Sequence, residues 1–571
     1  MEDYDVIIVG GGGITGLAVA AYCAKSGLKT LALEARGECG TQCDTLELGL
    51  PGFVHNFHAT WLMNAISPVM YDLNLCDFGL EMLATEHAYA HSFLDRTNVI
   101  QSIDPVAVIE NWGKHSAKDA GFMELGGVFF MEHFDEFRDI FHRFLHDPPS
   151  EKLLRELGDF AEGFCKTAGI NLSWDQMYHM TGYELLDHMF ESEKIKLMCA
   201  SWSLISAFYP AHKTIGALGV LLTALGTVFK PVHTARGGSH ALTHSLVKAA
   251  TAAGAKILPC CPVSKIIVEN NEAKGVMLSP DAVFANEKIY AKKIVSNVSL
   301  VPTFLDLIGE DVIGSDMAKK VAKFNYDEQG LFCIDIALDS SPQFASAAFD
   351  DAVQKSWMGY FGGQTTKEAE AEIKGIINRT IPEIPMANYF IPTWADPSQA
   401  PEGCHTLIIW SDTPTRPLRW KDKSLKGSES WDDIKEELAD GLIDEIDKFA
   451  PGIKKSMLER FIYTPLDIWR NNPSAVYGCW CCGAMAPGQF WMDRPLPGIR
   501  PSDSMSRTFI KNLHLCQSIP LGNATFLSCA YAAAREIVEA MDAFDPNVFK
   551  ASMGDWIMDN LDHIPVNLGV R

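Results

Sequence analysis

The first thirty-odd residues alternate between apolar runs and turn residues. Val6–Val9 is a short run rich in β-branched side chains, which is typical of a strand in a buried parallel sheet. Leu17–Ala24 contains small and straight-chain residues that favour a helix, and Ser26-Gly27 would end that helix. Leu28–Leu33 is a second apolar run. The order of strand, helix and strand predicts a βαβ unit and therefore an α/β fold.

The pattern changes twice further along the chain. Residues 76 to about 231 predict mostly helices, because four phenylalanines between 134 and 144 recur at helical spacing and Ser150 is a candidate N-cap for the next helix. Residues 325–500 alternate strands with helices such as Trp431–Phe449. A last strand, Asn512–Cys516, precedes a long helix of small residues with Thr525 near its start. Between these regions the predicted strands are Lys256–Leu258, Val263–Glu269, Ala273–Leu278, Lys288–Tyr290 and Lys293–Ser296.

Gly11, Gly13 and Gly16 form a G-x-G-x-x-G pattern between the first strand and the first helix. A side chain at the first two positions would block a tight turn and the approach of a pyrophosphate, whereas the third glycine lets the helix pack on the strand. The free N–H groups and the positive end of the helix attract an anion. A bare pattern of this kind arises by chance about once in four such chains, but Glu34 follows the second strand where a carboxylate would bind ribose hydroxyls. The sequence therefore predicts a dinucleotide site.

A second fingerprint of this kind is not convincing. The glycine pairs in "ARGGSH" and "YFGGQT" lack the flanking strand and helix. A nicotinamide-binding domain is therefore not expected. A quinone, oxygen or a small redox protein is the expected electron acceptor.

Composition and charge limit the class of protein. A chain of 571 residues with 47% hydrophobic and 21% charged residues is long enough for two or three lobes and is not disordered overall. Its net charge of −24 argues against nucleic acid as a partner and against electrostatic docking on anionic lipid. No secretory leader is recognised before the first strand, so a cytoplasmic location is expected. Ile215–Phe229 is too short to span a bilayer comfortably, which favours a buried helix, with peripheral membrane contact as the alternative.

The fifteen cysteines form no pattern of metal ligands. Neither the group of Cys479, Cys481 and Cys482 nor the pair of Cys39 and Cys43 has a histidine pair nearby at ligand spacing. Reduced thiols that fill the core are the expectation, and no metal site is predicted.

Segments along nearly the whole chain resemble the phytoene-desaturase-like branch of the flavin amine oxidase superfamily. They are the N-terminal fingerprint, "TARGGSHALTHSLVKAATAAGAKIL" (234–258), "CCPVSKIIVENNEAKGVML" (260–278), "KKIVSN" (292–297), "TPLDIW" (464–469), "GQFWMDRP" (488–495) and the strand, loop and helix of 512–540. The resemblance implies a discontinuous Rossmann-type FAD-binding domain built from residues 1–75, 232–300 and 503–571, the last including a C-terminal tail. It also implies an α+β substrate domain with a mixed sheet over 301–502. A helical lobe over 76–231 would cover an apolar tunnel.

The same resemblance assigns the cofactor-binding residues. The three glycines would hold the pyrophosphate, Glu34 the adenosine ribose, and Val263 the adenine through its backbone. The N-terminus of a helix near Asn523–Phe526 would point at the flavin ring, where it stabilises the negative charge of the reduced ring. The full expected set is Gly11, Gly13, Ile14, Thr15, Gly16, Glu34, Ala35, Arg36, Gly40, Gln42, Val263, Asn523, Ala524, Thr525 and Phe526.

Two segments depart from the family pattern. The family has a G-G-R-x-x-[ST] segment near the pyrophosphate, whereas here Gly40 is followed by Thr41 and Gln42. Losing the arginine removes a cationic phosphate partner worth about 1–3 kcal/mol. The aspartate and Gly-Pro that the family often has beside the flavin are absent from "GFVHNFHAT" (52–60). These departures would suit a weakly flavinated scaffold subunit of a hetero-oligomeric dehydrogenase, whereas the intact fingerprint favours an enzyme.

Members of this family remove hydride and a proton from hydrophobic isoprenoids, or rearrange their C=C bonds. The resemblance therefore implies an FAD-dependent dehydrogenase or desaturase that abstracts hydride from an allylic C–H of a terpene, with or without addition of water. A redox-neutral isomerase or a saturase of the same family is the alternative, and amine oxidation is a weaker one. Whether the chain forms a homo-oligomer or joins a related chain stays open.

Two features are candidates for contact with the substrate. His55 and His58 are candidate catalytic residues, because the family places their loop near the flavin and histidine titrates near neutrality. The aromatic stretch Tyr477–Trp491 is a candidate lining for an apolar or cationic substrate, although core packing would explain it equally well.

Overall fold

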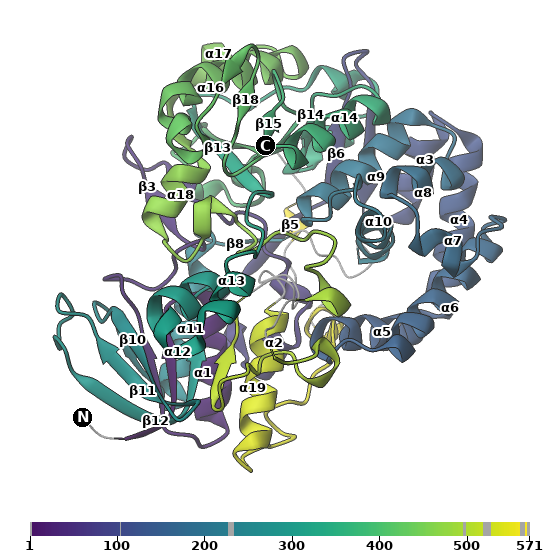
Figure 1. Cartoon of the computed structure of the whole chain (residues 1–571). Coiled ribbons are helices and arrows are strands. Elements are labelled where there is room, and N and C mark those ends of the chain that lie inside the picture. Colours follow the sequence, from purple (N-terminus) through teal and green to yellow (C-terminus); the bar gives the residue numbers. More distant parts are fainter. Residues whose placement is uncertain are drawn as a thin grey trace.

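The computed structural model describes residues 3–102, 104–226, 233–494, 498–517, 527–559 and 566–567. Two large sheets and a group of helices account for most of these residues (Figure 1). The first sheet lies beside the N-terminus, at the lower left of Figure 1, and the second lies above it. The helices of residues 105–226 form a separate group at the right.

Three separate stretches of chain supply the first sheet, which confirms the discontinuous Rossmann-type fold. Its strands are β1 (Tyr4–Val9), β2 (Thr30–Leu33), β9 (Lys256–Leu258), β10 (Val263–Glu269), β11 (Glu272–Leu278), β12 (Lys288–Ser296) and β21 (Leu513–Leu515). β1 pairs in parallel with β2 on one side and with β12 on the other, so that Ile7 lies between Leu31 and Ile294. β9 extends the sheet beyond β2, and β21 extends it beyond β12. The antiparallel hairpin of β10 and β11 continues from the first half of β12.

Small residues allow close packing of the helices on this sheet. The helices are α1 (Ile14–Lys25), α11 (His240–Ala252) and α19 (Ser528–Ala540), and α1 contacts both of the others. Ten of the twelve residues of α1 are buried, and most of them are alanine, glycine or valine. Ser26 caps the helix and Gly27 follows with φ +84°, which confirms the predicted end.

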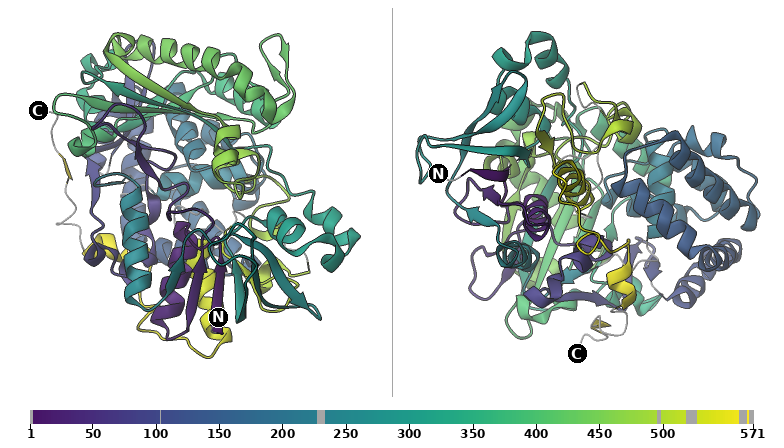
Figure 2. Two further views of the ribbon diagram at one scale, coloured as in Figure 1. Left: turned by 90° about the vertical axis from the view of Figure 1, so that its left-hand side faces the viewer. Right: turned by 90° about the horizontal axis from the view of Figure 1, so that it is seen from below.

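The second sheet is mostly antiparallel. Its order is β20-β13-β17-β16-β14-β6-β7, and only the pair of β14 and β6 is parallel. α16 (Trp431–Phe449) has the predicted bounds, buries its apolar face, and runs along this sheet in the left view of Figure 2. The strands are β6 (His87–Ser92), β7 (Asn98–Ser102), β13 (Gly330–Leu338), β14 (Met358–Phe361), β16 (Ala387–Phe390), β17 (His405–Thr413) and β20 (Met457–Tyr463).

Residues 82–102 correct the prediction that the chain is mostly helical from residue 76 onward. They form β5 (Met82–Thr85), β6 and β7, and a turn through Arg96 with φ +65° joins the last two strands. β6 and β7 end the second sheet and are buried along their whole length. Because both faces are covered, polar side chains also lie inside, so the alternation that marks a half-buried strand is missing.

The helical region begins at residue 105. It contains α3 (Pro105–Gly113), α4 (Ala117–Glu132), α5 (Phe134–His146), α6 (Glu151–Thr167), α7 (Trp174–Tyr178), α8 (Gly182–Met189), α9 (Glu193–Ile205) and α10 (Ile215–Gly226). The hydroxyl of Ser150 accepts a hydrogen bond from the N–H of Leu153 at 3.1 Å, which confirms the predicted N-cap of α6. α10 contacts α8 and α9, and its first two turns are largely buried. No helix in the described ranges is long and apolar enough to cross a membrane.

Shorter elements connect these parts. They are β3 (Thr45–Glu47), β4 (Val54–Asn56), α2 (Pro68–Asp72), β8 (Thr234–Ala235), α12 (Glu310–Ile313), α13 (Ser315–Val321), α14 (Thr366–Ile377), β15 (Thr380–Ile381), α15 (Pro392–Ala395), β18 (Arg419–Trp420), β19 (Lys423–Ser424), α17 (Ile453–Ser456), α18 (Pro465–Asn471), α20 (Asp555–Asp559) and β22 (Val566–Asn567).

Candidate functional site

A cavity of about 660 Å³ is lined by residues from both large sheets. The part of its lining that belongs to the first sheet consists of the ends of β1 and β2, the loop after β2, the start of β10 and the residues after β12. The part that belongs to the second sheet consists of Leu331 of β13 and Trp410 of β17. The carboxyl ends of parallel strands are the usual ligand-binding edge of such a sheet, so this cavity is the candidate site.

The glycines that follow β1, of which Gly16 lies in the first turn of α1, have two different roles. Gly10, with φ +68°, and Gly13 line the cavity. Gly11 and Gly16 do not line the cavity: a Cβ on Gly11 would lie 2.7 Å from the Cβ of Ala32, and one on Gly16 would lie 2.9 Å from the Cα of Gly11. The latter two glycines therefore permit close packing of β2 and α1. A Cβ on Gly13 would lie 2.9 Å from Nδ2 of Asn297, so a side chain at this position would displace the amide of Asn297.

Glu34 is buried and lies at the wall of the cavity. Its Oε2 accepts a hydrogen bond from the N–H of Gly12 at 2.9 Å, and its Oε1 accepts one from the N–H of Arg36 at 2.9 Å. An ionised carboxylate has about four lone-pair sites, so both oxygens keep capacity for ribose hydroxyls. Arg36 does not line the cavity; its guanidinium forms an ion pair with Asp44 at 2.9 Å.

Asn297 follows β12 and is a site residue that the sequence analysis did not single out. Its Oδ1 accepts a hydrogen bond from the hydroxyl of Thr15 at 2.6 Å, and its Nδ2 donates to the carbonyl of Gly10 at 2.9 Å. It lines the cavity and joins the two ends of the glycine loop. Its signal in the sequence is a polar residue directly after a strand, at the edge where parallel strands bind ligands.

The loop after β2 lies against the glycine loop. The N–H of Gly40 donates to the carbonyl of Gly12 at 3.0 Å. Gln42 lines the cavity, and its buried Nε2 has no hydrogen-bond partner within the ranges that the structure describes. A buried donor without a partner is costly, so it suits a bound acceptor such as a phosphate oxygen.

Some of the expected cofactor-binding residues therefore line one cavity and others do not. Those that line the cavity are Gly13, Ile14, Thr15, Glu34, Ala35, Gly40, Gln42 and Val263. Asn523, Ala524, Thr525 and Phe526 lie outside the described residues, and α19 is described from Ser528. The anion-attracting glycine loop, the carboxylate and the unpartnered amide fit the pyrophosphate and ribose of a dinucleotide.

Much of the rest of the cavity wall is apolar and aromatic, and its polar residues include Asp306, Asn472, Ser474 and Gln517. Trp410 and Trp480 are both at the wall, and their indole N–H groups have no hydrogen-bond partner among the described residues. Only part of the predicted stretch Tyr477–Trp491 takes part: Tyr477 and Trp480 line the cavity, whereas Trp491 stacks on Phe144 with ring centroids 5.0 Å apart. The aromatic and larger apolar residues of the lining include Trp61, Met63, Ile205, Leu331, Trp410, Trp469, Tyr477 and Trp480.

The two candidate catalytic histidines have different positions. His58 lines the cavity, its Nε2 has no hydrogen-bond partner in the part of the chain that the structure describes, and burial lowers its pKa to about 4. His55 does not line the cavity. It lies within β4, with its Nδ1 3.6 Å from the buried carboxylate of Asp335 and its ring 6.1 Å from that of Phe461. His55 is therefore a buried residue beside Asp335 of β13 and lies outside the cavity lining.

Asn56 has a structural role. Its Oδ1 accepts hydrogen bonds from the N–H of Ser239 at 2.8 Å and from the hydroxyl of Thr45 at 3.1 Å. Its Nδ2 donates to Gln399 at 3.3 Å. Asn56 therefore joins three segments of the chain.

Comparisons with known proteins agree with this geometry. Residues 8–74 match the family model described as NAD(P)-binding Rossmann-like domain. The chain is 26% identical over 561 residues to pyridine nucleotide-disulfide oxidoreductase domain-containing protein 2 of Rattus norvegicus, with 90% of each chain covered. It is 24% identical over 563 residues to one of the limonene dehydrogenase subunits of Castellaniella defragrans, with 95% of each chain covered.

Shorter and more distant matches extend the comparison. A phytoene desaturase (lycopene-forming) of Pseudescherichia vulneris is 22% identical over 289 residues, which is 50% of this chain and 52% of that protein. The solved structure of cyclohexylamine oxidase from Brevibacterium oxydans shares the fold, with a TM-score of 0.53 and 15% identity over 95% of this chain and 100% of that chain.

The fold and the cavity together define an FAD-dependent oxidoreductase with the architecture of the flavin amine oxidases. Within that class, the chain is a homologue of the phytoene-desaturase-like branch, as its motifs predicted, and FAD is its cofactor.

Proposed function

We propose that this chain is a dehydrogenase that removes a hydride from an allylic C–H of an uncharged isoprenoid. The observation that carries the proposal is the apolar, aromatic wall in the same cavity as the dinucleotide-binding residues. FAD, when bound, supplies the hydride acceptor. The relatives that act on limonene and form lycopene, as their names state, support a terpene as the substrate.

The aromatic wall supplies binding energy without a polar anchor. At about 0.8 kcal/mol per buried CH₂ group, ten carbons gain roughly 8 kcal/mol before the entropic cost of association. The rings of Trp410, Trp480 and their neighbours exclude water and present π faces that stabilise positive charge on an allylic carbon. Orientation of the substrate and exclusion of water are the main contributions that this chemistry requires.

We propose that His58 accepts the proton that leaves after hydride removal. Burial keeps the imidazole neutral at pH 7, because its pKa is about 4, and its Nε2 has no partner among the described residues. Such a weak base is sufficient, because a C–H next to an allylic cation is strongly acidic. Proton loss gives a new double bond, whereas capture of water by the same cation gives an alcohol.

The experiment is anaerobic mixing of the FAD-loaded protein with mono-, sesqui- and tetraterpenes, with absorption of the oxidised flavin as the readout and NADPH as the control. We expect at least one terpene to bleach the flavin and NADPH to have no effect. Trp480→Ala should slow bleaching while FAD stays bound. Trp491→Ala, from the same stretch but stacked on Phe144, is the matched control and should bleach like the unmodified protein.

Other results would overturn the proposal. Bleaching by NADPH alone would identify a saturase, and isomerisation of a terpene without lasting bleaching would identify an isomerase. Bound FAD that no terpene reduces, alone or with a second chain, would favour the scaffold subunit.

We also propose a partner subunit and an acceptor other than a nicotinamide. The relative whose name makes it one subunit of a limonene dehydrogenase supports a hetero-oligomeric enzyme. The single dinucleotide fingerprint supports a quinone, oxygen or a small redox protein as the acceptor. Stopped-flow reoxidation of the reduced protein with each acceptor tests this, since oxidation by NADP⁺ at a comparable rate would contradict it.

A further inference from the structure

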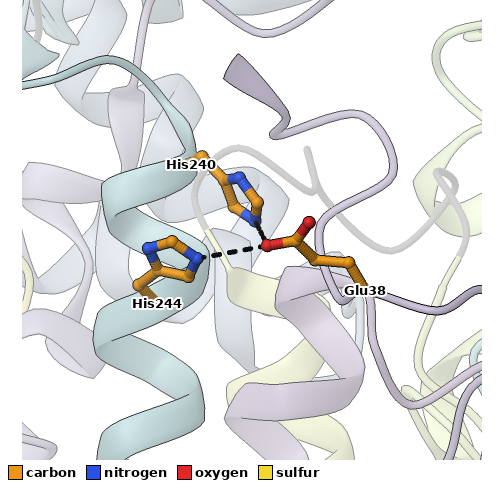
Figure 3. Close-up of side chains that lie close together, drawn as sticks. All are labelled: Glu38, His240 and His244. Carbon is orange, nitrogen blue, oxygen red and sulfur yellow. Dashed lines mark hydrogen bonds and ion pairs between the residues drawn. The ribbon is translucent and has the colours of Figure 1, made fainter. Parts of the chain in front are cut away.

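Outside the cavity, three side chains of types that commonly bind metals lie close together (Figure 3). His240 and His244 lie four residues apart on α11, and their ring centroids are 4.2 Å apart. Glu38, in the loop after β2, points between them. Its Oε1 is 3.6 Å from Nε2 of His240 and 3.5 Å from Nε2 of His244. One ligand atom from each residue lies within 4.8 Å of the others.

We propose that Glu38, His240 and His244 bind one zinc-class divalent transition-metal ion. Two imidazoles and a carboxylate are a common ligand set for zinc, with bonds of about 2.0–2.2 Å. Ligand atoms of a tetrahedral ion with bonds of about 2.1 Å lie about 3.4 Å apart. The two distances to Glu38 are within 0.2 Å of that separation. Calcium and magnesium are disfavoured, since both prefer oxygen ligands.

The groups around His240 suit a ligand role. Nδ1 of His240 is 3.4 Å from Oδ1 of Asp44, a buried carboxylate whose Oδ2 accepts a hydrogen bond from Arg36 at 2.9 Å. A carboxylate at one ring nitrogen holds the imidazole in the tautomer whose other nitrogen binds the metal. Nε2 of His240 is also 2.9 Å from the carbonyl of Cys39, to which it donates a hydrogen bond when no metal is bound, so binding of an ion would move the proton from Nε2 to Nδ1, beside Asp44.

An ion can reach this cluster from solvent. The side chains of Glu38 and His244 are 63% and 56% exposed, whereas that of His240 is 10% exposed. Both exposed ligands line a surface recess together with Val247 and Pro259. His240 is therefore a buried ligand, whereas the exposed side chains of Glu38 and His244 can move to contact an ion. A fourth coordination position would be left for a water molecule. The cluster contains no cysteine, so the spacing of the cysteines gives no sign of it.

The cluster joins α11 to the loop that borders the glycine loop. Glu38 stands two residues before Gly40, whose N–H donates to the carbonyl of Gly12. None of the three ligands is among the residues that line the FAD cavity. A bound ion would hold the 36–44 loop against α11, and its role is structural support of the cofactor site, not redox chemistry.

The test uses the full-length, FAD-loaded protein with any affinity tag removed and with metals stripped by a chelator. After dialysis against Zn²⁺, metal analysis should find one ion per chain, and Co²⁺ should give the intense visible bands of a tetrahedral site. Loss of an outer carboxylate typically weakens a metal site by about 10–100-fold, so loss of a ligand in H244A or E38Q should weaken Zn²⁺ binding by about 100-fold or more. Both substitutions are at exposed positions, so folding should be retained.

The matched control is H133A. His133 is the N-cap residue of α5, its side chain is 41% exposed, and its Nδ1 is 3.0 Å from a carboxylate oxygen of Glu136 in the first turn. H133A should bind Zn²⁺ like the unmodified protein, and D44N should weaken binding by about 10–100-fold. Less than a stoichiometric amount of Zn²⁺ in the unmodified protein would overturn the proposal. Equal affinity in H244A, E38Q and H133A would do the same and would identify the cluster as ordinary ion pairs.

Discussion

Removal of the Asn297 side chain should weaken both the fold and FAD binding. In Asn297→Ala the carbonyl of Gly10 loses its donor at 2.9 Å and the hydroxyl of Thr15 loses its acceptor at 2.6 Å. A buried polar group left without a partner costs about 1–3 kcal/mol, so the two groups together would cost about 2–6 kcal/mol. Because a hydroxyl can rotate, the Thr15 contribution is the smaller one, and we expect the unfolding free energy to fall by about 2–4 kcal/mol. The glycine loop then loses the residue that fixes its two ends. We expect FAD to bind about 10–100-fold more weakly, which corresponds to about 1.4–2.8 kcal/mol.

Two further variants separate the effect on the cofactor from the effect on the fold. Asn98 is also buried and begins β7 of the second sheet. Its Nδ2 donates to the carbonyls of Ser346 at 3.0 Å and Asp350 at 2.9 Å. Asn98→Ala should therefore destabilise the protein by a similar amount and leave FAD affinity unchanged. Asn297→Asp keeps the acceptor but places a carboxylate beside the carbonyl of Gly10 and the expected pyrophosphate. It should bind FAD more weakly than Asn297→Ala.

The assay is urea unfolding of the FAD-free proteins, combined with titration of FAD by its fluorescence. If Asn297→Ala lowers the unfolding midpoint as Asn98→Ala does but binds FAD like the unmodified protein, Asn297 only supports the fold. The glycine loop would then hold FAD without any contribution from Asn297.

Three other variants test the site. Gly13→Val should abolish FAD binding, because even a Cβ would lie 2.9 Å from Asn297 Nδ2; flavin retained after gel filtration would show that the site is misplaced. Gln42→Arg should tighten FAD binding or leave it unchanged, because its buried amide has no partner in the described residues, and a weaker complex in the fluorescence titration would contradict this. The pKa of His58 is about 4 in the folded state against about 6.5 unfolded, so protonation of the unfolded state removes up to about 3 kcal/mol of stability as pH falls from about 6.5 towards 4. His58→Asn should lose less thermal stability between pH 7 and pH 4.5 than the unmodified protein, and an equal loss would exclude a buried, neutral His58.

Elements with a clear period could be predicted from the sequence. Trp431–Phe449 and Val263–Glu269 have the predicted bounds, because a 3.6-residue stripe and a run of β-branched residues leave few alternatives. The strands of residues 82–102 could not be predicted in this way, because two of their polar residues, His91 and Asn98, are fully buried. Nδ1 of His91 lies 3.3 Å from the hydroxyl of Ser201, and Nδ2 of Asn98 donates to the carbonyls of Ser346 and Asp350, and a local pattern does not show such distant partners.

The nucleotide side of the site was more accessible to prediction than the substrate side. Gly13 and Glu34 belong to one continuous unit of chain, so their spacing carries the information. Asn297 reaches Thr15 across 282 residues, and only the pairing of β12 with β1 brings them together. The aromatic wall is similar, because Trp61, Trp410 and Trp480 come from distant segments with no shared spacing.

The three-part construction of the first sheet limits when the protein can mature on the ribosome. β1 ends at Val9, whereas its neighbour β12 begins at Lys288 and β21 begins at Leu513. At a synthesis rate of about 5–20 residues per second, β1 waits roughly 15–60 seconds for β12 to be made. During that time the side chains of β1 and α1 lack most of their partners, and such exposed apolar surface makes a chain prone to aggregation. Capture of FAD is therefore confined to a nearly finished chain, and a messenger truncated before Leu513 would yield a product that cannot complete its nucleotide-binding sheet.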